Sequence, residues 1–203
     1  MTTEVIDRWR SGKSPWGHTW QKNMMWWFIV TDGLLFAGFL CSYGFSRLGS
    51  SNWPPTSAYF STLFLTTMTF ILITSSATMA CAVGSSRAGD RKATRKFLLL
   101  TILGGLAFLG MQAFEWTHVI AEGLRPGVNP HGDTLFGAYF FIVTGFHGTH
   151  VLIGVLVILI TFLKRRGETC DLNPDGVELT GLYWHFVDLV WVVIFGAFYL
   201  IGS

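Results

Sequence analysis

Five long apolar runs constrain this chain more than any other feature. They occupy approximately residues 24–46, 58–83, 97–120, 135–163 and 179–201. Each run is long enough to cross the hydrocarbon core of a bilayer, which takes about 20 residues of helix. Because lipid offers the backbone no hydrogen-bond partners, segments that cross it must be helical. The sequence therefore predicts an all-α integral membrane protein that forms a bundle of five transmembrane helices.

The composition leaves no room for a separate soluble domain. Hydrophobic residues make up 51% of the 203 residues and charged residues 13%, against about 25% charged residues in soluble proteins. We expect residues 1–23 to form a cytoplasmic, interfacial segment, because Trp9, Trp16 and Trp20 alternate there with basic residues. Residues 24–203 would form the transmembrane domain. The first 20 residues lack the apolar stretch of a cleavable signal peptide.

Lysine and arginine side chains alternate between the two ends of the predicted helices. Of the 14 basic residues, all but Arg47 and Arg125 precede the first helix, join the second to the third, or follow the fourth. Because cytoplasmic loops carry the excess of positive charge, the N-terminus should be cytoplasmic and the C-terminus outside. Membrane topology accounts for these basic clusters, so we expect no nucleic-acid partner.

Acids and histidines inside the apolar runs are the candidate functional residues. Each costs about 2.5 kcal/mol or more at a lipid-facing helix centre, so each should face protein, water or an opposite charge. A rise of 1.5 Å per residue predicts an inner layer, an outer layer and one residue between them. In that order they are Asp32, His185 and Asp188; Glu115 and His147; and His150. His118 stands at the end of the third run.

The spacing of these residues predicts pairs. His147 and His150 are three residues apart and share a helix face, as do His185 and Asp188. Glu115 and His147 have similar predicted depths on neighbouring helices, so we expect them within reach of a direct or one-water hydrogen bond. An imidazole beside a carboxyl group lowers the cost of burying either one.

Three interpretations of the histidines stay open on spacing alone. They could ligate haem or copper, since imidazole suits both. Together with the carboxyl groups they could form a proton relay. They could also form hydrogen-bonded pairs that fix helix packing and contacts with lipids or other subunits. The cysteines lack metal-ligand spacing, and Cys41 and Cys81 have the pattern of small buried hydrophobic residues.

Five segments resemble subunit III of the haem–copper terminal oxidases. Residues 145–151 read GFHGTHV, and residues 183–191 read YWHFVDLVW. Residues 112–116 read QAFEW, and residues 28–36 read FIVTDGLLF, with Asp32 at the position of the family's membrane carboxylate, which is usually Glu. The turn Trp53-Pro54-Pro55 is similar to the family's WPP turn. These segments occur in the family's order and extend over nearly the whole chain.

The resemblance implies a role and a set of partners. The chain looks like the short, five-helix bacterial form, a non-catalytic subunit in the bacterial inner membrane. It would contact oxidase subunit I, stabilise it and support proton uptake through Asp32. Haem and copper would lie in partner subunits, and cytochrome c would bind through other subunits. We expect bound phospholipids, and membership of a respiratory supercomplex stays open.

Related functions remain as alternatives. A quinol oxidase has a similar five-helix third subunit, but GFHG at residues 145–148, where quinol oxidases more often read GTHG, favours cytochrome c as electron donor. A nitric-oxide-reductase accessory subunit of the same family is a further alternative. A proton-coupled transporter would also bury carboxylates, but the sequence lacks the internal repeat and broken helices that such transporters show.

Overall fold

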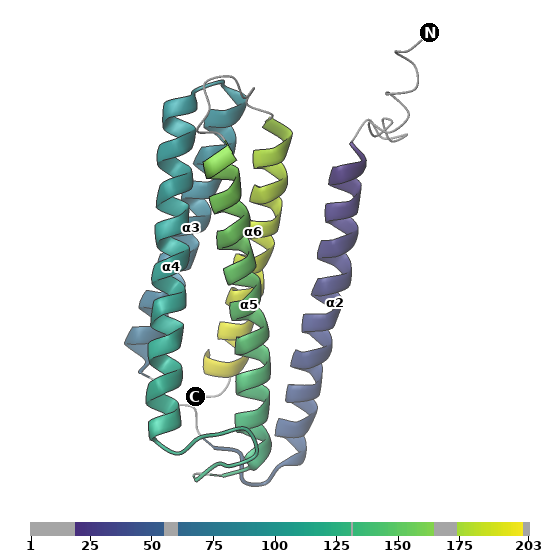
Figure 1. Cartoon of the computed structure of the whole chain (residues 1–203). Helices are drawn as coiled ribbons and strands as arrows, with labels where there is room; N and C mark the ends of the chain where they lie inside the picture. Colours follow the sequence, from purple (N-terminus) through teal and green to yellow (C-terminus); the bar gives the residue numbers. More distant parts are fainter. Residues whose placement is uncertain (1–18, 55–60, 131, 165–173, 201–203) are drawn as a thin grey trace.

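The protein is described by a computed structural model that places residues 19–54, 61–130, 132–164 and 174–200. Five long helices and a short π-helix follow one another along the chain. They are α2 (Trp20–Gly49), α3 (Thr62–Arg87), α4 (Arg91–Ala121), α5 (Thr134–Lys164), α6 (Pro174–Phe195) and the π-helix η2 (Gly196–Leu200). All five long helices are long and apolar enough to span a membrane. The predicted all-α fold with five spans is therefore confirmed (Figure 1).

The helices extend further than the apolar runs. We expected a loop at 84–96, but α3 continues to Arg87 and α4 begins at Arg91. Gly89 turns the chain with a φ of 76°, and the Asp90 carboxylate caps α4 by accepting a hydrogen bond from the Ala93 N–H at 3.0 Å. The predicted loop was too long because basic residues continue a helix readily outside the apolar core.

The start of α6 differs from the prediction for a similar reason. The expected acidic loop before residue 179 contributes the first turn of α6, which begins at Pro174. Proline is favoured at the first helical position, and acids such as Asp175 are favoured near a helix N-terminus. The Glu178 carboxylate then contacts Lys22 at 3.1 Å and Arg87 at 3.0 Å. These ion pairs join α2, α3 and α6 at one end of the bundle.

The first and last predicted boundaries also move. Residues 20–23, assigned to the interfacial segment, form the first turn of α2, and Lys22 lies within it. Residues 1–18 lie outside the described residues. The fifth predicted span, 179–201, comprises most of α6 together with η2, and residue 201 is not described.

Close contacts through glycine hold α3, α4, α5 and α6 together. A Cβ atom on Gly105 of α4 would lie 2.6 Å from the Trp184 ring of α6 and 2.6 Å from Val155 of α5. Trp184 is buried at the centre of these helices. Gly104 makes an equally close approach to Ser75 of α3, where a Cβ atom would lie 2.7 Å from the Ser75 Cβ. Small residues at such crossings let membrane helices pack backbone to backbone.

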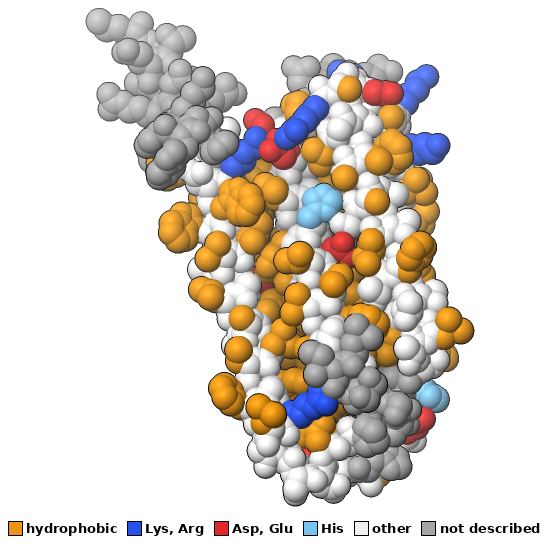
Figure 2. Space-filling model, turned by 180° about the vertical axis from the view of Figure 1, so that it is seen from behind, with side chains coloured by type: hydrophobic (Ala, Val, Ile, Leu, Met, Phe, Trp, Pro, Cys, Tyr) orange, Lys and Arg blue, Asp and Glu red, His pale blue; other side chains and the backbone are white. Residues whose placement is uncertain are grey.

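Helix α2 lies at the edge of this body, beside α5 and α6 (Figure 1). It buries the smallest share of its apolar window among the five helices. The hydrophobic side chains that α2 leaves exposed suit contact with lipid, and such side chains cover much of the molecular surface (Figure 2).

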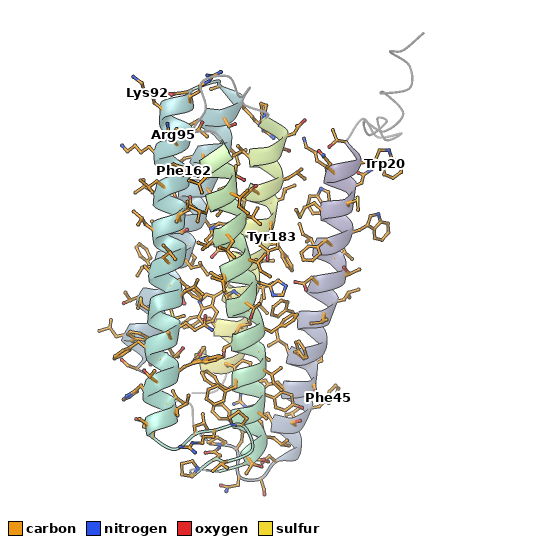
Figure 3. The ribbon with its side chains drawn as sticks, viewed as in Figure 1. Trp20, Phe45, Lys92, Arg95, Phe162 and Tyr183 are labelled. Atoms are coloured by element: carbon orange, nitrogen blue, oxygen red, sulfur yellow. The ribbon has the colours of Figure 1, made fainter. Side chains whose placement is uncertain are left out.

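The basic side chains of the described segments gather at one end of the molecule (Figure 2). We call this the basic end and define it by Lys22, Arg87, Arg91, Lys92 and Arg95. Figure 3 shows Lys92 and Arg95 there on α4, and the Arg95 guanidinium lies 5.4 Å from the centre of the Phe162 ring of α5. Arg47 and Arg125 lie at the opposite end, which we call the far end.

Two connections pack together at the far end. Trp53 contacts Tyr43 and Phe136 through edge-on ring contacts, and Pro54 is buried. The Asp133 N–H donates a hydrogen bond to the Asn52 carbonyl at 3.0 Å. The Leu135 N–H donates to the Asp133 carboxylate and lowers its pKa. Pro55, the third residue of the predicted turn, lies outside the described residues.

The glycine contacts predict opposite effects for two matched substitutions on α4. Gly105→Ala should destabilise the protein by about 1–3 kcal/mol, because the new Cβ atom overlaps Trp184 and Val155. Gly110→Ala meets no atom within 4 Å and should stabilise the helix by up to about 1 kcal/mol. Unfolding each variant in lipid–detergent bicelles measures both free energies. Equal effects of the two changes would contradict the packing described here.

Candidate functional site

Asp32 of α2 and His150 of α5 form the central polar contact between α2 and the body of the protein. The Asp32 Oδ2 atom lies 3.4 Å from Nε2 of His150, and both side chains are largely buried. This separation is within the range of an ion pair but exceeds that of a well-formed N–H···O hydrogen bond, about 2.7–3.2 Å. Asp32 Oδ2 accordingly has no well-aligned hydrogen bond among the described residues.

The other nitrogen of His150 determines how this contact can be protonated. Nδ1 lies 2.8 Å from the Phe146 carbonyl oxygen. A carbonyl only accepts hydrogen bonds, so Nδ1 carries a proton. Nε2 then faces Asp32 either as a lone pair or as a second N–H. An ionised carboxylate facing a bare lone pair would set two acceptors against each other, so the buried pair needs one proton between Nε2 and Oδ2.

Aromatic side chains enclose the Asp32–His150 pair. The Phe36 ring centre lies 5.6 Å from that of His150, and the Phe146 ring centre lies 4.6 Å from it. The Tyr183 hydroxyl of α6 donates a hydrogen bond to the His150 carbonyl at 3.0 Å. Tyr183 also contacts Phe28 of α2, and it lies on the side of α6 that faces α2 (Figure 3). This apolar enclosure strengthens the electrostatic contact inside it.

A second polar cluster joins α3 to α6. Its members are Ser76, His185 and Asp188, which we call the Ser76 cluster. The Ser76 hydroxyl lies 2.7 Å from Nδ1 of His185, and it also faces the Asp188 carboxyl group. The predicted His185–Asp188 face therefore meets a hydroxyl of α3. Asp32, expected in the same layer, pairs with His150 instead.

The outer layer does not pair as expected. The Tyr199 hydroxyl donates a hydrogen bond to Glu115 Oε1 at 3.3 Å, and Nε2 of His147 donates to the Val187 carbonyl at 3.2 Å. Glu115 Oε2 and His147 Nδ1 have no partner among the described residues. A direct hydrogen bond between Glu115 and His147 is therefore not formed. Hydroxyl and carbonyl groups on α6 meet their needs instead, and His118 pairs with Glu122 on its own helix at 3.3 Å.

Three functional tyrosine and serine side chains were missed at the level of sequence. Tyr183, Tyr199 and Ser76 supply hydrogen bonds to the charged or titratable residues or to their backbones. A hydroxyl group within an apolar run looks like ordinary helix packing, and Ser76 is one of many on α3. Tyr183 and Tyr199 could have been noticed as phenols whose hydroxyl groups need a partner when buried.

Metal coordination can be considered from the same geometry. Within the part of the chain that the structure places, no three His, Cys, Asp or Glu side chains lie close enough together to hold a metal ion. The titratable residues instead occur as separate pairs, each with a hydroxyl or carbonyl partner nearby.

The Asp32–His150 contact predicts a coupling free energy. Asp32→Leu or His150→Leu alone should each cost about 1–3 kcal/mol, because each leaves a buried polar partner behind. The double variant should cost less than the sum. Asp32→Asn should be milder, because an amide N–H can donate to the Nε2 lone pair. Unfolding of all variants in bicelles tests this, with Asp188→Leu and His150→Leu as a control pair from separate clusters. Additive costs for Asp32 and His150 would contradict the contact.

Comparison with known proteins agrees with the resemblance in the motifs. The model of the family described as Cytochrome c oxidase subunit III matches residues 18–203. Cytochrome c oxidase subunit 3 of Thermostichus vulcanus is 33% identical, with 86% of this chain and 84% of the relative aligned. Subunit 3 of the cytochrome bo(3) ubiquinol oxidase of Pseudomonas aeruginosa is 33% identical, with 88% and 83% aligned.

A third relative also carries a quinol oxidase name. The probable quinol oxidase subunit 3 of Staphylococcus aureus is 34% identical, with 87% of each chain aligned. Relatives from both electron-donor classes thus share similar identity with this chain. The predicted family is confirmed, and the chain belongs to the cytochrome c oxidase subunit III family, the third subunits of haem–copper oxidases.

Proposed function

We propose that this chain is the non-catalytic third subunit of a bacterial aerobic terminal oxidase, where it contacts subunit I, stabilises it and supports its proton uptake. The observation that carries the proposal is the buried Asp32–His150 pair between α2 and the body. A carboxyl group and an imidazole that hold one proton between them can take up and release it at a fixed depth. In this proposal haem and copper belong to partner subunits, and phospholipids cover the apolar surface.

We infer cytochrome c as the electron donor, bound through other subunits. The segment GFHG at residues 145–148 supports this choice over a quinol. The fold gives this segment a structural meaning, because His147 and Gly148 both lie at helix contacts. His147 donates to Val187 of α6, and Gly148 lies against Gln112 of α4. A quinol oxidase is the second candidate, supported by the relatives of that class.

Copurification tests the assignment. An affinity tag on this chain, used on membranes in mild detergent, should recover subunit I with its haem spectrum. The recovered complex should reduce oxygen with reduced cytochrome c as donor. This chain separated from subunit I should show no Soret band. Turnover with quinol alone would move the assignment to a quinol oxidase, and haem retained on the separated chain would contradict the proposed role.

Asp32→Asn tests the role in proton supply. The assembled variant should continue to reduce oxygen, but it should inactivate faster or take up protons more weakly as the pH rises, because free protons become scarce. Asp188→Asn, in the Ser76 cluster, is the matched control and should show no such pH dependence. Measurements of turnover and of its decay across a pH series give the result. Complete loss of activity in a fully assembled Asp32→Asn oxidase would contradict the supporting role.

The basic end predicts the orientation in the bacterial inner membrane. We propose that it faces the cytoplasm, because positive charge is retained on that side. In a background without the native cysteines, Val128→Cys at the far end should react with an impermeant thiol reagent in intact cells. Lys92→Cys at the basic end should react only after permeabilisation. The reverse pattern would invert the proposed topology.

A further inference from the structure

A shallow groove with a cavity volume of about 240 Å³ lies between α4 and α5, outside both polar clusters described above. It is lined in part by Gln112, Ala113 and Trp116 of α4 and by Gly145 and Gly148 of α5. The two glycines keep it open. A Cβ atom on Gly145 would lie 3.0 Å from the Trp116 ring, and one on Gly148 would lie 2.8 Å from Gln112 Oε1.

Gln112 gives this apolar groove a polar floor. Its side chain is 95% buried, with only 5% exposed. Its Nε2 atom donates a hydrogen bond of 2.7 Å to the Thr144 carbonyl. A carbonyl cannot donate, so the amide orientation is fixed and Oε1 is the free end. Oε1 has no hydrogen-bond partner among the described residues. The groove therefore contains a buried acceptor that lacks a donor.

The missing donor identifies the kind of occupant. A lipid acyl chain can fill an apolar groove, but it has no N–H or O–H group to offer Gln112. A transmembrane helix can supply a hydroxyl or amide side chain, and glycine-lined surfaces favour the close approach of such a helix. Gln112 lies nine residues, about 14 Å, from the last residue of α4. The donor must therefore reach well inside the membrane-spanning part of the helix, beyond the usual depth of lipid headgroups.

We propose that this groove docks a transmembrane helix of a partner oxidase subunit, through a hydroxyl- or amide-bearing side chain that donates a hydrogen bond to Gln112 Oε1. The inference rests on the proposed function, since it assumes that the chain assembles with other oxidase subunits. It adds the face of the bundle that meets the partner and the chemistry of the contact. Trp116 would pack against the partner helix beside the hydrogen bond.

Photocrosslinking in the intact oxidase tests the groove. A benzoyl-phenylalanine residue introduced at Ala113, which lines the groove, should form a covalent adduct with a partner oxidase subunit. The same residue at Ala107, an exposed position on another face of α4, is the matched control and should form mainly lipid adducts. Mass spectrometry of the adducts identifies the partner. Only lipid adducts at position 113, adducts with a second copy of this chain, or equal yields of subunit adduct at both positions would overturn the inference.

Two substitutions test the contact itself. Gln112→Met keeps the length and removes the acceptor, and Ala113→Phe fills the groove. Both should release this chain from the purified oxidase about tenfold more readily during detergent washing, the change expected from about 1.4 kcal/mol. Ala107→Phe should not change its retention. If the tagged wild-type chain copurifies with the oxidase but Ala113 crosslinks only lipid, the groove inference fails and the proposed function stands. If no oxidase subunit copurifies, both fail.

Discussion

The contact between Asp32 and His150 is the interaction on which the arrangement of α2 depends. Helix α2 packs only along one edge of the body and buries little of its surface. Its ion pairs with α6 lie at the basic end, and hydrogen bonds from Tyr139 to Ser42 and Ser46 lie towards the far end. The Asp32–His150 pair and its surrounding rings supply the contact between those ends. Because an isolated carboxylate would be costly there, Asp32 also favours the docked position of α2 over a detached one.

The same contact explains how a subunit without a described metal cluster can serve an oxidase. A proton held between a carboxyl group and an imidazole is defined in position but not bound irreversibly. The aromatic enclosure keeps water and lipid from competing for it. Helix packing and proton handling are therefore alternative consequences of one buried pair, which is why a conservative amide substitution separates them.

The sequence predicted the five spans because apolar length is sufficient to identify a membrane helix. It misplaced helix ends such as Arg91 and Pro174, because capping and ion pairing extend a helix beyond its apolar core. The polar residues were also identifiable from sequence, since a buried acid such as Asp32 is conspicuous. Their partners were not, because spacing along one helix defines a face but not the residue opposite it. Tyr199 rather than His147 therefore pairs with Glu115.

The most direct test of this account is a short-range solid-state NMR measurement on the protein in lipid bilayers, with carbon-13 in aspartate and nitrogen-15 in histidine. The account predicts a correlation between the Asp32 carboxyl carbon and Nε2 of His150, together with a protonated Nδ1 on that ring. Absence of this correlation in the folded protein, or an unprotonated Nδ1 of His150, would contradict it.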